Sequence, residues 1–372
     1  MGIFKKLKKT LSYIYHKNIF KIIFKNYNFY LLKNLRKNLM NKINGYGFII
    51  LFSKNIFISH TIRPNKFKEK ILTNKLVNSF DDFALIIQGP LDLKHNFTLE
   101  TLKYYKLNYD CKIILSTWEG ENINIMNEIK ELDIDVLINK KPKTSGWGNI
   151  NYQTQSTYNA IKYAKHLGKK YVAKTRTDTR IYSIDFLYYC SHLLRSYKLK
   201  TNQNRIITLG TIATKKYLPF ALSDLFQFGA INEMIEFWSP NSWEKDIKSI
   251  FNNKTIINET PIVAEIFLAS RYYIKKFKKI NFELKDWWLF IKNEVIIIDP
   301  CSIDFFWHKY DYEHENSFYQ SYNIKHSKQF SHIDWLYLQE NDISKFDFNK
   351  INSLREKWEN CDKNLIRKKR IR

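Results

Sequence analysis

The feature that most constrains the fold is a series of short apolar runs that begins at Phe83 and alternates with stretches of helical character. Uninterrupted apolar runs of this length are typical of strands that a parallel sheet buries on both faces. The stretches 97–109, 123–132 and 151–167 have the length of helices that connect such strands. The chain is therefore expected to form a mostly parallel α/β sheet covered on both faces. The expected strands are 83–87, 112–115, 135–138, 171–173, 206–209 and 295–298.

The basic charge of the chain is concentrated near its N-terminus. The 372 residues carry 61 Lys and Arg against 36 Asp and Glu, and the first 80 residues hold 17 of these bases and one acid, Glu69. If residues 4–25 form a helix, Leu11 and Ile22 share an apolar side with lysines broadly opposite, which suits a helix lying on an anionic membrane surface. A helical extension packed on the protein is the alternative. Drift of an A+T-rich coding sequence explains much of the lysine excess equally well.

Composition excludes several classes of protein. With 44% hydrophobic and 16% aromatic residues the chain has the side chains for a large core, so it is not a disordered basic protein. Its four cysteines form no CxxC pair, which indicates no zinc knuckle and fits a reducing cytosol. We find no signal-peptide pattern, no apolar stretch approaching the ~18 residues of a spanning helix, and no RNA-binding signature. We therefore expect a cytoplasmic protein without a nucleic-acid partner.

These patterns divide the chain into three parts. Residues 1–80 are expected to form a basic, partly amphipathic and helical extension. Residues 81–312 hold the α/β domain. Residues 313–372, which are aromatic and rich in charge, are expected to form capping helices and a basic tail.

Residues that follow the first two expected strands are candidate ligand contacts, because ligands of open parallel sheets bind at the carboxyl ends of strands. Gln88, Gly89 and Pro90 follow the first strand, and the glycine permits close approach of the backbone to a ligand. Thr117 and Trp118 end the second, where an indole is suited to stacking on a base or sugar ring. Ordinary surface turns are the alternative at both places.

The most specific local pattern is KTRTDTR, directly after the expected strand 171–173. In a chain with only eleven arginines, Arg176 and Arg180 flank Asp178, and Lys174 precedes them. Such a group indicates a site where cations meet an anion such as a diphosphate while the carboxylate binds a metal or a sugar hydroxyl. A structural network of ion pairs is the alternative.

The start of the helix 151–167 is a further candidate phosphate site, because a helix N-terminus presents free N–H groups and the positive end of the helix dipole. Asn149 and Gln153 lie there. A merely capped helix is the alternative. Two acids downstream, Asp224 and Glu265, are candidates for a general base, and a helix cap or surface carboxylate is an equally good interpretation of either.

Five motifs in order carry a family resemblance: ALIIQGP, IILSTW, GNINYQTQSTYNAIKYAKHLGKKYVAKTRTD, LSDLFQFG and the acid Glu265. Together they resemble the WavE lipopolysaccharide synthesis family of bacterial glycosyltransferases over residues 83–310. The resemblance implies a glycosyltransferase A-type fold, which is a Rossmann-like α/β sandwich, and the use of a nucleotide-activated sugar.

In glycosyltransferases of that fold, a strand ends in an Asp-x-Asp pair that binds a divalent metal, Mg²⁺ or Mn²⁺, and the donor diphosphate. Here Arg176 stands in place of the first aspartate and only Asp178 remains, so metal dependence stays open. The predicted catalytic residues are Asp224, Glu265 and Asp178, with Asp178 also the metal ligand. The predicted donor-binding residues are Gln88, Gly89, Pro90, Thr117, Trp118, Asn149, Gln153, Lys174, Arg176 and Arg180.

The sequence thus predicts transfer of a sugar from a nucleotide-sugar donor to a lipid-linked acceptor, a lipopolysaccharide or related surface glycan, at the cytoplasmic face of the inner membrane. A nucleotidyl- or phosphotransferase is one alternative, although the chain has neither a GxxxxGK[ST] nor a clear GxGxxG loop. A non-enzymatic basic protein that binds a membrane or nucleic acid is another, and it predicts no role for Asp178.

Overall fold

The computed structural model comprises two compact units, residues 1–64 and 65–372. In the first, strands β1 (Ile49–Ser53) and β2 (Ile56–Ser59) pair antiparallel as a hairpin. The helix predicted over residues 4–25 lies outside the described residues. The structure describes residues 49–53, 56–59, 80–199, 204–210, 214–240, 264–278, 282–310, 329–351 and 353.

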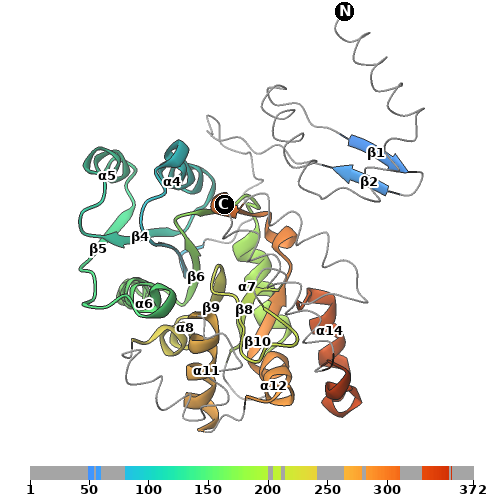
Figure 1. Ribbon diagram of the computed structural model, residues 1–372. Coiled ribbons are helices and arrows are strands. Elements are labelled where there is room, and N and C mark those ends of the chain that lie inside the picture. The colour runs from blue at the N-terminus through green and yellow to red at the C-terminus, as the bar shows by residue number, and fades with distance from the viewer. Residues whose placement is uncertain are drawn as a thin grey trace, which may run out of the picture. The chain divides into compact units, whose positions relative to one another are not determined.

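The second unit is built on a seven-stranded sheet with the strand order β10-β8-β9-β6-β3-β4-β5 (Figure 1). All neighbouring strands are parallel except β9, which runs antiparallel to β6 and β8. The six predicted strands are all present, and the predicted α/β sandwich with a mostly parallel sheet is confirmed. The strands are β3 (Phe83–Gln88), β4 (Lys112–Trp118), β5 (Asp135–Asn139), β6 (Tyr171–Arg176), β8 (Ile206–Leu209), β9 (Gln227–Ala230) and β10 (Val295–Ile298).

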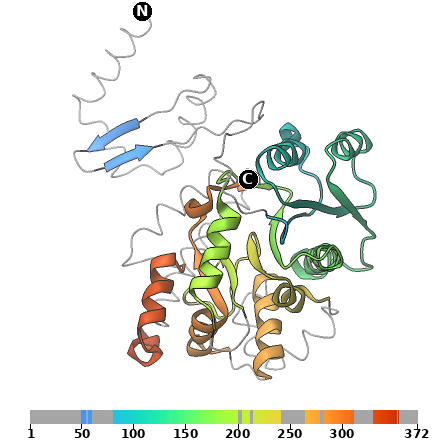
Figure 2. The same ribbon diagram turned by 180° about the vertical axis from the view of Figure 1, so that it is seen from behind.

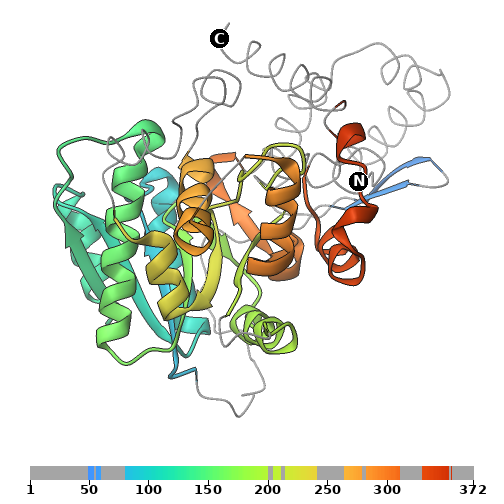
Figure 3. The same ribbon diagram turned by 90° about the horizontal axis from the view of Figure 1, so that it is seen from below.

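Helices cover both faces of this sheet, as the continuous apolar strands require. Helices α6, α8, α11 and α12 lie on one face, and α4, α5 and α7 lie on the other (Figures 1 and 3). No helix in the described part of the chain is long and apolar enough to cross a membrane. The helices are α4 (Phe97–Asn108), α5 (Ile123–Lys130), α6 (Ile150–His166), α7 (Phe186–Ser196), α8 (Ile231–Trp238), α11 (Ala264–Phe277), α12 (Leu284–Glu294) and α14 (His332–Glu340).

The last of these helices, α14, packs beside the edge strand β10, as the view from behind also shows (Figure 2). Its Trp335 is fully buried and donates a hydrogen bond from Nε1 to the carbonyl of Val295 at 2.7 Å. Ser331 and Asp334 form a capping box at its N-terminus, which satisfies backbone N–H groups there. This contact covers a strand edge that would otherwise expose unpaired backbone groups.

Strand β3, which lies between β4 and β6, is buried in the core. Residues 84–87 of this strand have no exposed surface, and burying each isoleucine or leucine contributes about 1.5–3 kcal/mol. The register sets Gln88 opposite both Ser116 of β4 and Arg176 of β6. The carboxyl ends of three neighbouring strands therefore lie level at one edge of the sheet.

The order of the strands also places a switch point at this edge. From β3 the chain proceeds to β4 and β5 on one side and then returns to β6 on the other side. The connections that leave β3 and β6 consequently diverge and open a crevice between them, which is where α/β sheets bind ligands.

A small two-stranded sheet and two tyrosines fix the segment that follows β6. Strand β7 (Thr179–Ile181) pairs antiparallel with β11 (Phe305–Trp307). Tyr105 Oη accepts a hydrogen bond from the Ile181 N–H at 2.8 Å, and Tyr109 Oη donates to the Ile181 carbonyl at 2.8 Å. Burial raises the pKa of Tyr105 and Tyr109, so both hydroxyls stay protonated. The KTRTDTR segment is therefore anchored at its C-terminal end.

Gly89 allows β3 and the segment after β6 to approach closely. Its φ is +130°, and a Cβ at this position would lie 2.7 Å from Thr177 Oγ1. The Gly89 N–H donates to the Ser116 carbonyl at 3.1 Å, which holds the turn against β4. Only glycine has both the backbone freedom and the space that this turn needs.

We predict that Gly89→Ala lowers the free energy of unfolding by about 3 kcal/mol, because it adds a steric clash to backbone strain. Gly120→Ala is the matched control, since Gly120 has a φ of +88° but a Cβ there would meet no atom within 4 Å, and we expect a loss of about 1 kcal/mol. Urea denaturation of both variants measures the difference. Equal losses in the two variants would show that the clash with Thr177 does not contribute to the fall in the free energy of unfolding.

Candidate active site

A cleft of about 690 Å³ opens at the carboxyl ends of the central strands. Its walls come from the turn after β3, the end of β4, the N-terminus of α6, the end of β6 and the segment after β11. It occupies the switch point described above, where two connections diverge. The lining residues are Gln88, Gly89, Pro90, Leu91, Asp92, Lys94, Trp118, Glu121, Lys141, Asn149, Tyr152, Gln153, Arg176, Thr177, Asp178, His308 and Lys309.

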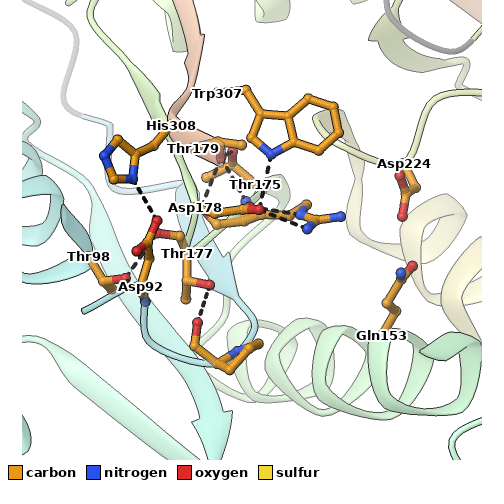
Figure 4. A network of polar contacts seen from close by, with 12 residues as sticks. Asp92, Thr98, Gln153, Thr175, Thr177, Asp178, Thr179, Asp224, Trp307 and His308 are labelled. Atoms are coloured by element: carbon orange, nitrogen blue, oxygen red, sulfur yellow. Dashed lines mark hydrogen bonds and ion pairs between the residues drawn. The ribbon is translucent and has the colours of Figure 1, made fainter. Parts of the chain in front are cut away.

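An ion pair between Arg176 and Asp178 forms one side of the cleft (Figure 4). Arg176 Nε donates to Asp178 Oδ1 and Arg176 Nη2 donates to Oδ2, both at 2.9 Å. Trp307 Nε1 donates a third hydrogen bond to Oδ2 at 3.0 Å, and the guanidinium lies 5.5 Å from the Trp307 ring centre. This bidentate arrangement fixes the plane of the guanidinium.

The two charges stabilise each other against partial burial. Burial opposes ionisation of Asp178, but the Arg176 charge and the hydrogen bonds from Arg176 and Trp307 hold the pKa of its carboxyl below the usual value. Burial likewise disfavours the charged form of Arg176. The attraction of nearby carboxylates, chiefly that of Asp178, is stronger than this effect of burial, so the pKa of the guanidinium is raised. The pair is therefore fully charged near neutral pH.

A second pair, Asp92 and His308, lies beside the first. His308 Nδ1 lies 2.7 Å from Asp92 Oδ2, and its ring stacks on Phe97 with centroids 4.3 Å apart. The His308 backbone N–H donates to the Asp178 carbonyl at 3.0 Å, which connects the two pairs. The imidazole is thus oriented by a carboxylate on one nitrogen and by an aromatic face.

Threonines hold the backbone beneath these charges. Thr177 Oγ1 donates to the Pro90 carbonyl at 2.5 Å, and Thr98 Oγ1 donates to the Thr177 carbonyl at 3.0 Å. The Asp92 N–H in turn donates to Thr98 Oγ1 at 2.8 Å. These bonds join the turn after β3, helix α4 and the segment after β6 into one support (Figure 4), which limits the movement of the cleft side chains.

Aromatic side chains form another wall. Trp118 and Tyr152 have ring centroids 5.2 Å apart at 54°. Trp118 is almost buried, so only part of its ring is open to a ligand. Thr117 lies behind it and donates to Glu121 Oε1 at 3.0 Å, while Glu121 Oε2 accepts the Leu91 N–H at 3.3 Å.

The N-terminus of α6 supplies a third part of the cleft. Asn149 precedes the helix with a φ of +62°, a conformation that Asn tolerates better than most residues. Gln153 Nε2 lies 3.4 Å from the Gly148 carbonyl, and Gln153 Oε1 is a buried acceptor without a hydrogen-bond partner among the described residues. A buried acceptor left unpaired costs free energy, so this position is suited to a ligand that donates a hydrogen bond.

Two acids and a lysine form a group adjoining the cleft, in which Lys174 and Asp224 are buried and Glu265 is half-buried. Lys174 has no exposed surface, donates from Nζ to the Asp224 carbonyl and lies 4.7 Å from the ring centre of Trp238. Burial lowers the pKa of Lys174 to about 8. Glu265, in the first turn of α11, has its pKa raised to about 7 by burial and by the negative charge of Asp224. A carboxyl with such a pKa can exchange a proton near neutral pH.

One family model matches this chain, that of WavE lipopolysaccharide synthesis, over residues 83–370. The match spans most of the chain and includes every wall of the cleft. The chain belongs to the WavE lipopolysaccharide synthesis family. The predicted family resemblance is therefore confirmed. None of the curated proteins compared with the chain matches it.

Solved structures similar to this WavE family member include three with low sequence identity. A cytidylyltransferase from Leptospira borgpetersenii is 13% identical with a TM-score of 0.33, and the match covers 70% of this chain and 94% of that one. Core-mannan synthase A from Aspergillus fumigatus, in an Mn/GDP form, is 9% identical with a TM-score of 0.29, covering 60% and 82%. HddC from Yersinia pseudotuberculosis is 14% identical with a TM-score of 0.27, covering 41% and 79%. TM-scores this low transfer no activity to this chain.

The structure of this family member separates the predicted site residues into two sets. Thr117, Lys174, Arg180, Asp224 and Glu265 do not line the cleft, although Asp224 and Glu265 act electrostatically on Arg176 from behind it. The set that lines the cleft is Gln88, Gly89, Pro90, Trp118, Asn149, Gln153, Arg176 and Asp178.

The side chain of Arg180 contacts the protein core and not the cleft. Its side chain is 1% exposed, and its Nε donates to Thr101 Oγ1 at 2.9 Å. Its guanidinium lies 4.7 Å from the Phe97 ring centre, inside the packing between α4 and β7. Alternation explains this orientation, because residues on β7 point successively to opposite faces.

The cleft also contains residues that sequence reasoning did not select. Asp92, Glu121, Lys141 and Tyr152 line it, together with Lys94. Asp92 follows the QGP turn by two residues, so its position after a strand is the signal that was available. Nothing in the sequence indicated that Asp92 and His308 form a pair.

The geometry around Asp178 does not fit a resident Mg²⁺ or Mn²⁺. Such ions need several oxygen ligands, yet both carboxylate oxygens of Asp178 accept hydrogen bonds from Arg176, whose positive charge occupies the place of the cation. No group of three or more His, Cys, Asp or Glu able to hold a metal occurs among the residues that the structure describes. The role of Asp178 seen here is to orient Arg176.

We predict that Glu265→Gln removes a pH dependence of stability. The folded pKa is about 7 and the unfolded pKa is about 4.3, so the folded state alone holds the proton between these values. The free energy of unfolding of the parent protein should therefore fall as the pH rises from about 4.5 to about 7. At pH 8 the variant should be more stable by on the order of 2 kcal/mol.

Urea denaturation at pH 5 and pH 8 measures this difference. Glu128→Gln is the control, since that side chain is 49% exposed and lies 3.5 Å from Lys103. If the parent protein and the Glu265 variant showed the same change between the two pH values, the raised pKa would be contradicted.

Proposed function

We propose that this protein is a glycosyltransferase that moves a sugar from a nucleotide-sugar donor to a lipopolysaccharide or related surface-glycan acceptor. The observation that carries the proposal is the cleft at the switch point of the sheet, where the Arg176–Asp178 pair, an aromatic wall and a helix N-terminus converge. These are the groups that a diphosphate, a base or sugar ring and polar hydroxyls require. Membership of a lipopolysaccharide synthesis family supports the substrate class.

In this proposal, each wall of the cleft binds a different part of the donor. Gln88, Gly89 and Pro90 provide the turn against which the nucleotide lies, and Trp118 with Tyr152 provides the apolar surface for its ring. The N-terminus of α6 faces the sugar, where the unpaired Gln153 Oε1 accepts a hydrogen bond from a sugar hydroxyl. Binding energy spread along the donor in this way fixes the reacting carbon.

The departing nucleoside diphosphate sets the largest electrostatic requirement of the reaction. Negative charge accumulates on its phosphate as the glycosidic bond breaks, and preorganised cations near that oxygen lower the barrier most. Arg176 is the cation whose orientation the structure fixes, and Lys94, Lys141 and Lys309 also line the cleft.

Glu265 is the base that we assign to the acceptor hydroxyl. Its pKa of about 7 suits a group that takes a proton near neutral pH. Asp224 is buried nearby, and its charge raises that pKa. In Figure 4 the side chains of Asp224 and Gln153 point toward one another beside the cleft, which is consistent with a sugar hydroxyl meeting the acids at this end.

The acceptor is a lipid-linked glycan at the cytoplasmic face of the inner membrane in this proposal. The support is the family match together with the 17 basic residues of the first 80, which favour an anionic membrane surface.

A thermal-shift experiment tests nucleotide-sugar binding. We expect one class of nucleotide sugar, from a panel of UDP-, GDP-, CDP-, ADP- and dTDP-linked sugars, to raise the melting temperature at millimolar concentration, because a ligand that binds only the folded state stabilises it by mass action. The matched free sugars are the control. If no donor raised the melting temperature while the protein unfolded cooperatively, the proposed function would be wrong.

Two variants test the assignment of the base. Glu265→Gln should lower the rate of sugar transfer by about a hundredfold or more while leaving donor affinity unchanged. Asp224→Asn should shift the acidic limb of the pH–rate profile to lower pH, since it removes the charge that raises the pKa of Glu265. Release of the nucleotide product, followed across pH 5–9, gives both readouts. A Glu265→Gln variant with full activity would contradict the assignment.

A further inference from the structure

We propose that Arg176, held in place by Asp178 and Trp307, binds the donor diphosphate directly, so that this protein binds its nucleotide without a divalent cation. This inference rests on the proposed function, because it concerns how the same cleft holds the donor. It makes Asp178 a positioning residue and not a metal ligand.

Arg176 has N–H groups that do not bond to Asp178 and that can donate to a ligand. A guanidinium carries five N–H groups, and Asp178 accepts from only two of them, on Nε and Nη2. The side chain of Arg176 is 25% exposed and lines the cleft. An arginine fixed along one edge therefore presents its other edge to the cleft at little entropic cost, which favours a phosphate that accepts two parallel hydrogen bonds.

The carboxylate is poorly placed to bind a metal. Its Oδ1 accepts from Arg176, and its Oδ2 accepts from both Arg176 and Trp307. A divalent cation at Asp178 would have to displace these donors and would then lie beside a guanidinium of the same sign. Burial alone would raise the pKa of this carboxyl. The Arg176 charge and the same hydrogen bonds have the larger effect, so the pKa lies below its usual value.

The neighbouring pair repeats the arrangement. Asp92 engages Nδ1 of His308 at 2.7 Å, and the imidazole is further fixed by stacking on Phe97. Since His308 also lines the cleft, its Nε2 is the ring nitrogen left for a ligand. Two basic side chains, each oriented by its own aspartate, thus lie at one side of the cleft and are linked through the bond from the His308 N–H to the Asp178 carbonyl.

Calorimetric titration with UDP, GDP, CDP, ADP and dTDP, each in EDTA and in Mn²⁺, tests the inference. We expect at least one nucleotide to bind in EDTA with a dissociation constant within about threefold of the value in Mn²⁺. Binding that requires Mn²⁺ would overturn this inference and leave the proposed function standing. No binding by any nucleotide in either buffer would overturn both.

Asp178→Asn distinguishes positioning from metal binding. We expect it to weaken the bound diphosphate in EDTA by about tenfold or more, because the asparagine no longer holds the guanidinium by charge. Affinity for the corresponding unphosphorylated nucleoside, measured by ligand-observed NMR, should stay the same, which a general loss of structure would not allow. Unchanged diphosphate affinity in EDTA would overturn the inference.

If Asp178→Asn folds poorly, two further variants test the same inference. Arg176→Lys keeps a positive charge but cannot form the two-pronged contact, and it should show the same selective loss of diphosphate affinity. Asp82→Asn is the matched control, because Asp82 forms an exposed ion pair with Lys170 before β3 and β6, at the opposite edge of the sheet. It should leave every affinity unchanged, and an equal loss in Asp82→Asn and Arg176→Lys would overturn the inference.

Discussion

Complete burial of strand β3 is the constraint on which the cleft depends. Residues 84–87 are enclosed by β4 and β6 at their sides, within a sheet that helices cover on both faces. A strand buried in this way can present functional groups to solvent only at its ends. The order of the strands then selects the carboxyl end of β3, because the chain departs to one side through β4 and returns to the other through β6.

At that edge, the polar groups stabilise one another before any ligand arrives. Asp178 is engaged by Arg176 and Trp307, Asp92 by His308, and the backbone between them by threonine hydroxyls. Fixed, hydrogen-bonded charges of this kind need little reorganisation when a charged substrate binds. The acids Asp224 and Glu265 differ, because they repel each other in a buried place and Glu265 holds its proton to about pH 7. The charged pairs thus line the cleft, whereas the acid that exchanges a proton near neutral pH lies behind it.

Local pattern is sufficient to predict six of the seven strands of the large sheet, all but β9, and much of the cleft. It selects Gln88, Trp118, Asn149 and Asp178 because they follow apolar runs or begin a helix, and the register of a parallel sheet brings such ends together. The same reasoning selects Arg180, the second residue of β7, whose side chain is buried against Phe97. Proximity in sequence to a motif does not show which face of the strand the side chain occupies.

The sequence by itself determined the alternation of strands and helices, the class of the sheet and the family, because each depends on short-range apolar patterning or on ordered motifs. It also indicated that Arg176 replaces an expected acid. Only the tertiary structure decided what Asp178 does: its partner Trp307 is 129 residues away along the chain, and Asp92 meets His308 across a separation of 216. Pairings over such distances follow from how β11 returns to β7, which no local pattern encodes, since they depend on packing of the whole sheet.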